Sequence, residues 1–166
     1  MTRAQGGCLA FLLALACVAC ASHRSTTQTR SGSATVTTSQ DSKSVTVQTN
    51  EGTTSIGQPV DVGTLGVPLY PGAQAGQPAS ITTVKNAIST TIANFMTTDA
   101  FDTVYAYYKR QLPPASEKMK VTSANGSVAS FQVGGPTDAD TVSVQISSDR
   151  PNLTNILITH ATKTQR

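Results

Sequence analysis

The chain has 166 residues, a net charge of +3 at pH 7 and three cysteines, all within the first 20 positions. Its twelve lysines and arginines are scattered, whereas a nucleic-acid-binding surface gathers basic residues in a stripe with aromatic residues between them, so we expect no nucleic-acid partner. Only 13% of the residues are charged, which is low for a globular protein; serine and threonine take their place, as is common in exported proteins.

Residues 1–16 are predicted to be a secretory leader. Arg3 supplies a positive charge, and an uncharged, mostly apolar run extends from Leu9 to Ala19. The run is too short for a membrane-spanning helix, which needs about 20 apolar residues. Its length and basic flank are those of a secretory signal.

Two cysteines at the end of this run, Cys17 and Cys20, each follow a small residue. The pattern resembles the signals of bacterial lipoproteins, in which the cysteine sulfur takes a diacylglycerol, the chain is cut before that cysteine and the new amine is acylated. The resemblance implies a lipid on Cys17, where the preceding residues fit better, or on Cys20, where the cut leaves a longer apolar run. A zinc or redox site is disfavoured because no cysteine follows Cys20. The next residue, Val18 or Ala21, is not aspartate, which by resemblance to enterobacterial sorting implies the outer membrane.

Residues 17–43 are predicted to be a disordered tether between lipid and domain. From residue 21 on, serine, threonine, glutamine and small residues dominate, and Val36 is the only large aliphatic residue. Such a segment buries too little apolar surface to offset the entropy lost on ordering. His23 lies in it and is predicted to be unstructured rather than a ligand.

Residues 44–66 are predicted to form a short hairpin and a linker. The stretch SVTVQT alternates valine with polar residues, the period-two pattern of a half-buried strand. Asn50-Glu51-Gly52 is a turn signal, after which TTSIG returns as a second strand. A lone hairpin is marginally stable in water, so we expect it to dock on the rest of the protein.

Residues 67–162 are predicted to be an α+β domain, followed by a tail at 163–166. Two strands flank a turn at Lys85-Asn86, a helix follows, and four strands occupy the remainder. We expect an antiparallel β-sheet (meander) with one α-helix packed across one face, in the order β-β-α-β-β-β-β and preceded by the short hairpin. A chain of this length buries roughly 60% of its unfolded surface, which supports one core.

The helix is predicted from the segment DAFDTVYAYYKRQLPP. Its apolar residues recur at helical spacing and so form one face; they are Phe101, Val104, Tyr105, Tyr108 and Leu112. Asp99 is predicted to cap the first amides, and Pro113-Pro114 to end the helix.

No catalytic residue, metal site or cofactor site is predicted. The domain contains one histidine, His160, on a terminal strand and outside any recognisable nucleophile motif, so a hydrolase is disfavoured. Asp138 and Asp140 lie between two strands, with a spacing that is incomplete for a calcium loop. Tyr107, which lies off the apolar helix face, is the sole candidate for an aromatic platform that would bind a sugar. We predict instead that it is a partly covered surface residue.

Three segments of the chain together resemble a group of poorly characterised bacterial lipoproteins. These are KSVTVQTNEGTTSIG, LGVPLYPGAQ and FMTTDAFDTVYAYYKRQL. The group shares a Val-rich hairpin, a V-P-x-YPGA box and a T-x-D…V…YY-K helix before further strands. The resemblance covers most of residues 44–162 and implies an exported lipoprotein of unassigned role, with no catalytic residue to carry over.

Two interpretations of the YPGA box are open. Tyr70, Pro71 and Gly72 form either a contact site on an exposed loop or a structural clasp in which Tyr70 covers the edge of the core. Stiffening by Pro68 and Pro71 suits both interpretations. A large ring followed by small residues favours the clasp.

The sequence predicts a lipid-anchored protein of the bacterial cell envelope that acts without catalysis, as a protein-contact or binding module. Its expected partners are the membrane, through the N-terminal lipid, and another envelope protein. The alternative is a carrier or sensor that binds a small apolar ligand between helix and sheet. A carrier should have an open cavity lined by Phe95, Phe101, Tyr105 and Phe131, whereas a packed domain should have none.

Overall fold

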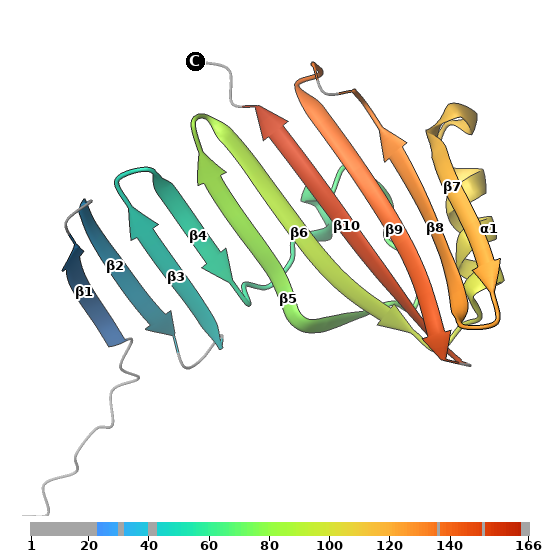
Figure 1. Cartoon of the computed structure of the whole chain (residues 1–166), viewed down its shortest axis with the longest axis horizontal. Helices are drawn as coiled ribbons and strands as arrows, with labels where there is room; N and C mark the ends of the chain where they lie inside the picture. Colours follow the sequence, from blue (N-terminus) through green and yellow to red (C-terminus); the bar gives the residue numbers. More distant parts are fainter. Residues whose placement is uncertain (1–22, 30–31, 40–42, 136, 151, 164–166) are drawn as a thin grey trace, which may run out of the picture.

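The computed structural model describes residues 23–29, 32–39, 43–135, 137–150 and 152–163. Within these ranges the strands form one ten-stranded sheet, and one α-helix packs against it (Figure 1). Neighbouring strands are antiparallel throughout. The predicted α+β class, an antiparallel sheet with one helix, is therefore confirmed.

The first six strands follow one another across the sheet, each beside its predecessor. They are β1 (His23–Thr29), β2 (Gly32–Ser39), β3 (Ser44–Thr49), β4 (Gly52–Ile56), β5 (Gln74–Lys85) and β6 (Ile88–Thr97), with the 3-10 helix η1 (Val62–Thr64) before β5. The second half consists of α1 (Phe101–Gln111), η2 (Pro114–Ser116), β7 (Glu117–Ser123), β8 (Gly126–Val133), β9 (Asp140–Arg150) and β10 (Leu153–Lys163).

The strand order differs from the predicted meander. After β6 the chain passes through α1 to the far edge of the sheet, and β7, β8 and β9 then return until β10 pairs with β6. This pairing places Ile156 opposite Phe95 and Ile158 opposite Ala93, and all four side chains are buried. The exchange of neighbours thus brings β10, with the buried Ile156 and Ile158, beside β6 in the centre of the core.

The predicted tether is also corrected by the structure. Residues 23–29 and 32–39 form β1 and β2, and β2 pairs with β3. The physical reason is that threonine is β-branched and favours extended backbone, although it contributes little apolar burial. The predicted hairpin is likewise part of the same sheet, because β4 pairs with β5.

Several predicted features lie outside the described residues. They are the leader 1–16, both candidate lipidation residues Cys17 and Cys20, the start of the tether, and residues 164–166 of the tail. Lys163, predicted to begin the tail, is instead the last residue of β10.

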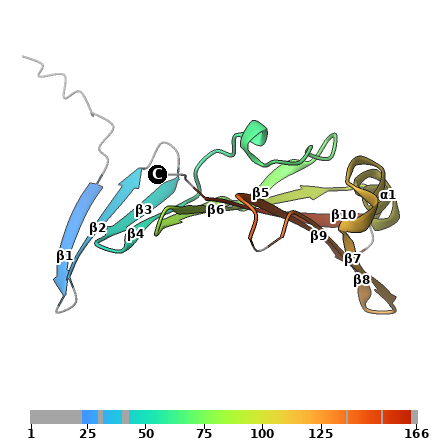
Figure 2. The ribbon, with the colours of Figure 1, turned by 90° about the horizontal axis from the view of Figure 1, so that it is seen from above.

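The core lies between α1 and one face of the sheet. Phe101, Val104, Tyr105 and Tyr108 of α1 are buried, and so is Leu112 just beyond it, which confirms the predicted helix face. Figure 2 shows α1 and the segment 57–73 on the same side of the sheet. Hereafter the opposite side is called the open face.

Of the two predicted ends of α1, the C-terminal one is confirmed and the N-terminal cap is not. The helix ends at Gln111, Leu112 is its C-cap, and Pro113 and Pro114 come next, in agreement with the prediction that these prolines end the helix. The N-cap is Ala100, with no side-chain cap, so the prediction of Asp99 as the cap is wrong. The Asp99 carboxylate instead accepts a hydrogen bond from the Tyr70 hydroxyl.

Candidate functional site: a groove on the open face

A groove of about 440 Å³ lies on the open face, across β5, β6, β10 and β9. This volume is within the range of small-ligand sites, which is about 300–1,000 Å³. Aliphatic and amide side chains dominate its lining, which consists of Pro78, Ser80, Ile81, Ile92, Asn94, Gln145, Ser147, Asn155 and Leu157.

Cross-strand register brings the groove residues together. Ile81 lies opposite Ile92, and Leu157 lies opposite both Asn94 on one side and Gln145 on the other. Because side chains alternate between the two faces of a strand, these residues point away from the core that their sequence neighbours fill. An aliphatic floor with amide groups beside it results.

An irregularity in β5 shapes one wall of the groove. The register between β5 and β6 shifts between Ala75 and Ser80, and Pro78 lies within this interval. A Cβ atom at Gly76 would lie only 2.5 Å from Nδ2 of Asn94, so the lack of a side chain at Gly76 leaves room for the Asn94 amide. Bulges of this kind commonly re-aim a side chain next to a functional site.

The lining of the groove is uncharged. The amides of Asn94, Gln145 and Asn155 each offer donors and an acceptor. Within the described part of the chain, these three side chains make no hydrogen bond. The groove therefore suits a partner that presents apolar groups to the floor and uncharged polar groups to the amides.

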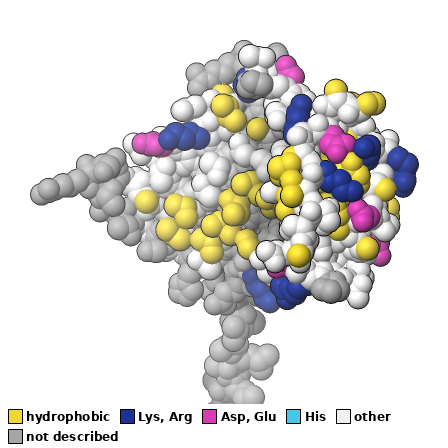
Figure 3. Space-filling model, turned by 45° about the vertical axis from the view of Figure 1, so that its right-hand side comes forward, with side chains coloured by type: hydrophobic (Ala, Val, Ile, Leu, Met, Phe, Trp, Pro, Cys, Tyr) yellow, Lys and Arg dark blue, Asp and Glu magenta, His cyan; other side chains and the backbone are white. Residues whose placement is uncertain are grey.

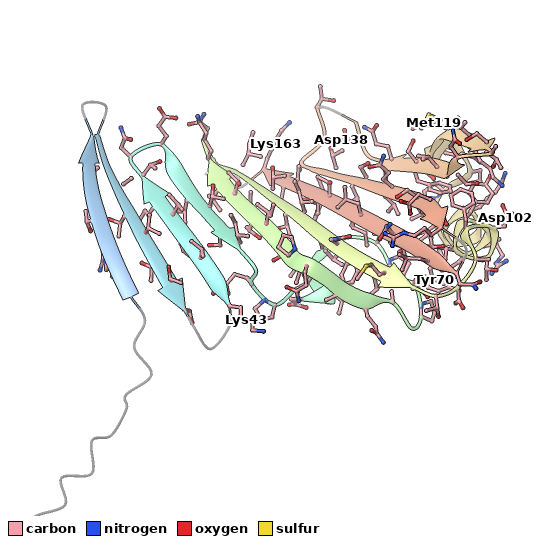
Figure 4. All side chains as sticks on the ribbon, turned by 60° about the horizontal axis from the view of Figure 1, so that its bottom comes forward. Lys43, Tyr70, Asp102, Met119, Asp138 and Lys163 are labelled. Atoms are coloured by element: carbon pink, nitrogen blue, oxygen red, sulfur yellow. The ribbon has the colours of Figure 1, made fainter. Side chains whose placement is uncertain are left out.

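The YPGA box lies elsewhere, at the end of β6 near the start of α1 (Figure 4). The Tyr70 side chain is 7% exposed, its ring packs edge-on against Tyr107 at 5.2 Å, and its hydroxyl donates to Asp99 at 2.5 Å. The hydrogen bond to Asp99, helped by burial, raises the pKa of Tyr70 to about 12. Pro71 and Gly72 are exposed, and Gly72 has φ +81°. This geometry favours the clasp, which stays a prediction until variants are measured.

Tyr107 and Tyr108 extend the same aromatic cluster. The half-buried Tyr107 donates its hydroxyl to the Leu69 carbonyl at 3.1 Å, which fastens α1 to the YPGA box. The Tyr108 ring is fully buried and packs edge-on against Tyr107 at 5.2 Å. Among the described residues its hydroxyl has no hydrogen-bond partner, and burial raises the pKa of Tyr108.

His160 is fixed between the sheet and the segment that carries η1. Its Nδ1 lies 2.6 Å from the Thr64 carbonyl, while Nε2 faces Thr162 Oγ1 at 3.3 Å and Asp140 Oδ1 at 3.6 Å. In a catalytic triad the nucleophilic hydroxyl contacts one ring nitrogen of the histidine, and the carboxylate contacts the other. Here both groups share Nε2 and a backbone carbonyl occupies Nδ1, which is a structural arrangement.

The two loop aspartates point to different partners. Asp138 accepts a hydrogen bond from the Gly135 amide at 2.7 Å, whereas Asp140 faces His160. Within the described ranges, no three His, Cys, Asp or Glu side chains gather in a way that would hold a metal ion.

The aromatic residues of the carrier interpretation are packed together. Phe95, Phe101, Tyr105 and Phe131 are all buried, and Tyr105 lies against both Phe101 and Phe131, with ring centroids 6.2 Å and 5.7 Å apart. They fill the space between α1 and the sheet and line none of the grooves described here. The carrier interpretation gains no support from this geometry.

Sequence analysis singled out none of the groove residues. The available signal was weak: Ile81, Ile92 and Leu157 each stand at the alternate position of a strand whose other side is buried. Among the described residues, no helix has both the length and the apolar character needed to cross a membrane. Comparison of the chain with family models, curated proteins and solved structures gives no match.

Proposed function

We propose that this chain is a lipid-anchored protein of the bacterial cell envelope that acts as a non-enzymatic binding module through the open-face groove. The observation that carries the proposal is an aliphatic floor, formed by Ile81, Ile92 and Leu157, beside amides that make no hydrogen bond within the described part of the chain. Such a surface binds by apolar contact and hydrogen bonding. The arrangement around His160 supports a structural role for the histidine.

The proposed anchor is a lipid on Cys17 or Cys20, in the outer membrane. Its support is the apolar run, the small residue before each cysteine and the residue that follows. The membrane is then a partner through the lipid. An uncharged groove and lysines already paired with carboxylates, such as Lys85 with Glu51 and Lys120 with Asp102, argue against a nucleic-acid partner.

The anchor would hold the sheet close to the bilayer. Residues 18–22, or 21–22 alone, separate the lipidated cysteine from His23, the first residue of β1. An extended chain spans at most about 3.5 Å per residue, so β1 would start within roughly 20 Å of the lipid. The proposed module therefore works near the membrane surface and not at the end of a long tether.

Site-specific photo-crosslinking in the cell tests the binding role. A photoreactive residue replaces Gln145, which is exposed in the groove, and in a matched control replaces Gln111, which is exposed at the end of α1. We expect crosslinked products from position 145 and far fewer from position 111. Equal yields at both positions, or none at 145, would contradict a binding role for the groove.

Intact-mass measurement of the mature protein tests the anchor independently. We expect an N-terminal lipid on Cys17 or Cys20. A mature chain with a free N-terminus and no lipid would refute it.

A further inference from the structure

The groove is one end of a larger apolar feature on the open face. Val45, Ile56, Ile81 and Ile92 lie directly opposite one another on β3, β4, β5 and β6. We call these four residues the aliphatic row. Ile56 is 37% exposed and the other three are half-buried, and Figure 3 shows hydrophobic side chains gathered in a band across this side of the molecule.

No described element covers the aliphatic row. The helix α1 contacts β9 and β10 from the other side of the sheet, and the segment 57–73 lies on that side as well (Figure 2). A β-sheet with an apolar face is stable when that face is buried against a second layer. Among the described residues, no element supplies such a second layer for the open face.

We infer that a second copy of this chain provides that layer, with the two open faces stacked as a β-sandwich. The inference rests on the proposed function, because Ile81 and Ile92 belong to both the row and the groove, and it names the partner of that site. The first argument is area. Seven strands, in the sheet order β2-β3-β4-β5-β6-β10-β9, with about six residues each, cover roughly 34 Å by 20 Å, or about 700 Å² per copy. Specific, stable interfaces bury about 600–1,000 Å² per partner, and a contact of this size lies within that range.

The second argument is symmetry. A two-fold dimer brings the same patch of both copies together, so the patch must be complementary to itself. The aliphatic row runs straight across the strands, and a two-fold axis between the sheets lays it on its own copy. Stacked sheets pack with their strands within about 30° of each other, which keeps the two rows in contact along their length.

The third argument is charge. On this face the charged side chains of the described β5 and β10 are at the rim, where Lys85 pairs with Glu51 at 2.8 Å and Lys163 ends β10. Stacking two copies therefore leaves no charge in the centre of the contact. A face that binds a bilayer combines basic residues with Trp or Phe, whereas this row is aliphatic and the chain has no tryptophan.

Paired cysteine variants of the full chain test the arrangement in its own membrane. Thr83→Cys places a thiol on the open face of β5, and Thr82→Cys places one on the opposite face of the same strand. A bifunctional thiol reagent that spans the sheet spacing of about 10 Å should join two copies of the Thr83→Cys variant. The parent and the Thr82→Cys variant should give only the background of the N-terminal cysteines.

Charge substitution tests the same contact by affinity. Ile56→Lys puts like charges opposite each other in the dimer, while Val84→Lys changes an exposed aliphatic residue on the other face. By sedimentation of the detergent-extracted full chain, we expect Ile56→Lys to weaken self-association about tenfold or more, and Val84→Lys about twofold at most.

Each outcome decides between the proposals. A monomeric parent, or equal crosslinking at positions 82 and 83, overturns the inference of a second copy. If position 145 then still crosslinks to a different protein, the groove remains a binding site and only the partner is wrong. If position 145 gives no product and the parent is monomeric, both proposals fall.

Discussion

Truncation of the Tyr70 side chain tests whether the YPGA box is a structural clasp. Tyr70→Ala removes a ring that is 7% exposed, its edge-on contact with Tyr107 and its hydrogen bond to Asp99. Replacing a buried aromatic residue by alanine costs about 3–5 kcal/mol, because transfer energy is lost and a cavity remains. We therefore expect the free energy of unfolding to fall by about 3 kcal/mol or more.

Tyr70→Phe separates the hydroxyl from the ring. A hydrogen bond to a charged group is worth about 1.5–3 kcal/mol. Asp99 is exposed, so water can replace the lost donor, and we expect a smaller cost of about 1 kcal/mol. The double variant with Asp99→Asn should cost less than the sum of the two single variants, because both remove the same hydrogen bond.

Urea unfolding of the full chain measures these differences as shifts of the midpoint at constant slope. Thr98→Ala, an exposed neighbour of Asp99, serves as a control and should leave the midpoint unchanged. If Tyr70→Ala unfolds at the parental midpoint, the ring is not part of the core in solution and the clasp is wrong. Loss of cellular function in such a stable variant would mark the box as a contact site.

Three further predictions concern other close contacts of the structure. The pKa of Tyr70, raised by Asp99 from 10 to about 12, favours the neutral hydroxyl in the folded state, so stability is full below pH 10 and falls as the pH rises toward 12; urea midpoints against pH should show this fall, and Tyr70→Phe should reduce it. Gly76→Ala should displace the Asn94 amide and cost about 1–3 kcal/mol by overpacking, and an unchanged urea midpoint would contradict the tight contact. Lys120→Gln removes an ion pair with the exposed Asp102 and a cation 3.9 Å from the Tyr105 ring centroid, so we expect a cost of about 1–2 kcal/mol, of which only the ion-pair part shrinks in high salt; a cost that vanishes in high salt would contradict the contribution of the ring.

Local sequence patterns were sufficient for the helix and most strands. The helical spacing of Phe101, Val104, Tyr105 and Tyr108 identified a face that is buried, and the two prolines identified its end. The cap was wrong because Asp99 has a stronger use: its carboxylate accepts from Tyr70, which is distant in sequence and adjacent only in the fold. A local sequence pattern for an N-cap cannot show that a distant residue, here Tyr70, will bind the same carboxylate.

The two N-terminal strands were missed because the low hydrophobicity of the segment predicts disorder, whereas the backbone preference of its threonines favours strands. Threonine disfavours a buried core but favours extended backbone, and β2 has a ready-made partner in the edge of β3. Pairing to an existing sheet orders a segment that would not form a core by itself. Low hydrophobicity therefore predicts disorder less well for a segment that lies next to a strand in the chain.

The open face depends on register between strands far apart in the chain, which no single segment contains. In β5 and β6, threonine and isoleucine place β-branched residues on both sides, so alternation does not say which side is buried. The choice is made by α1 and the segment 57–73, which lie on one side only. The aliphatic row lies on the side that neither of these two elements covers. The four residues of the row are β-branched, as threonine is. Replacing them with threonine should therefore preserve the sheet and remove only the proposed contact with a second copy.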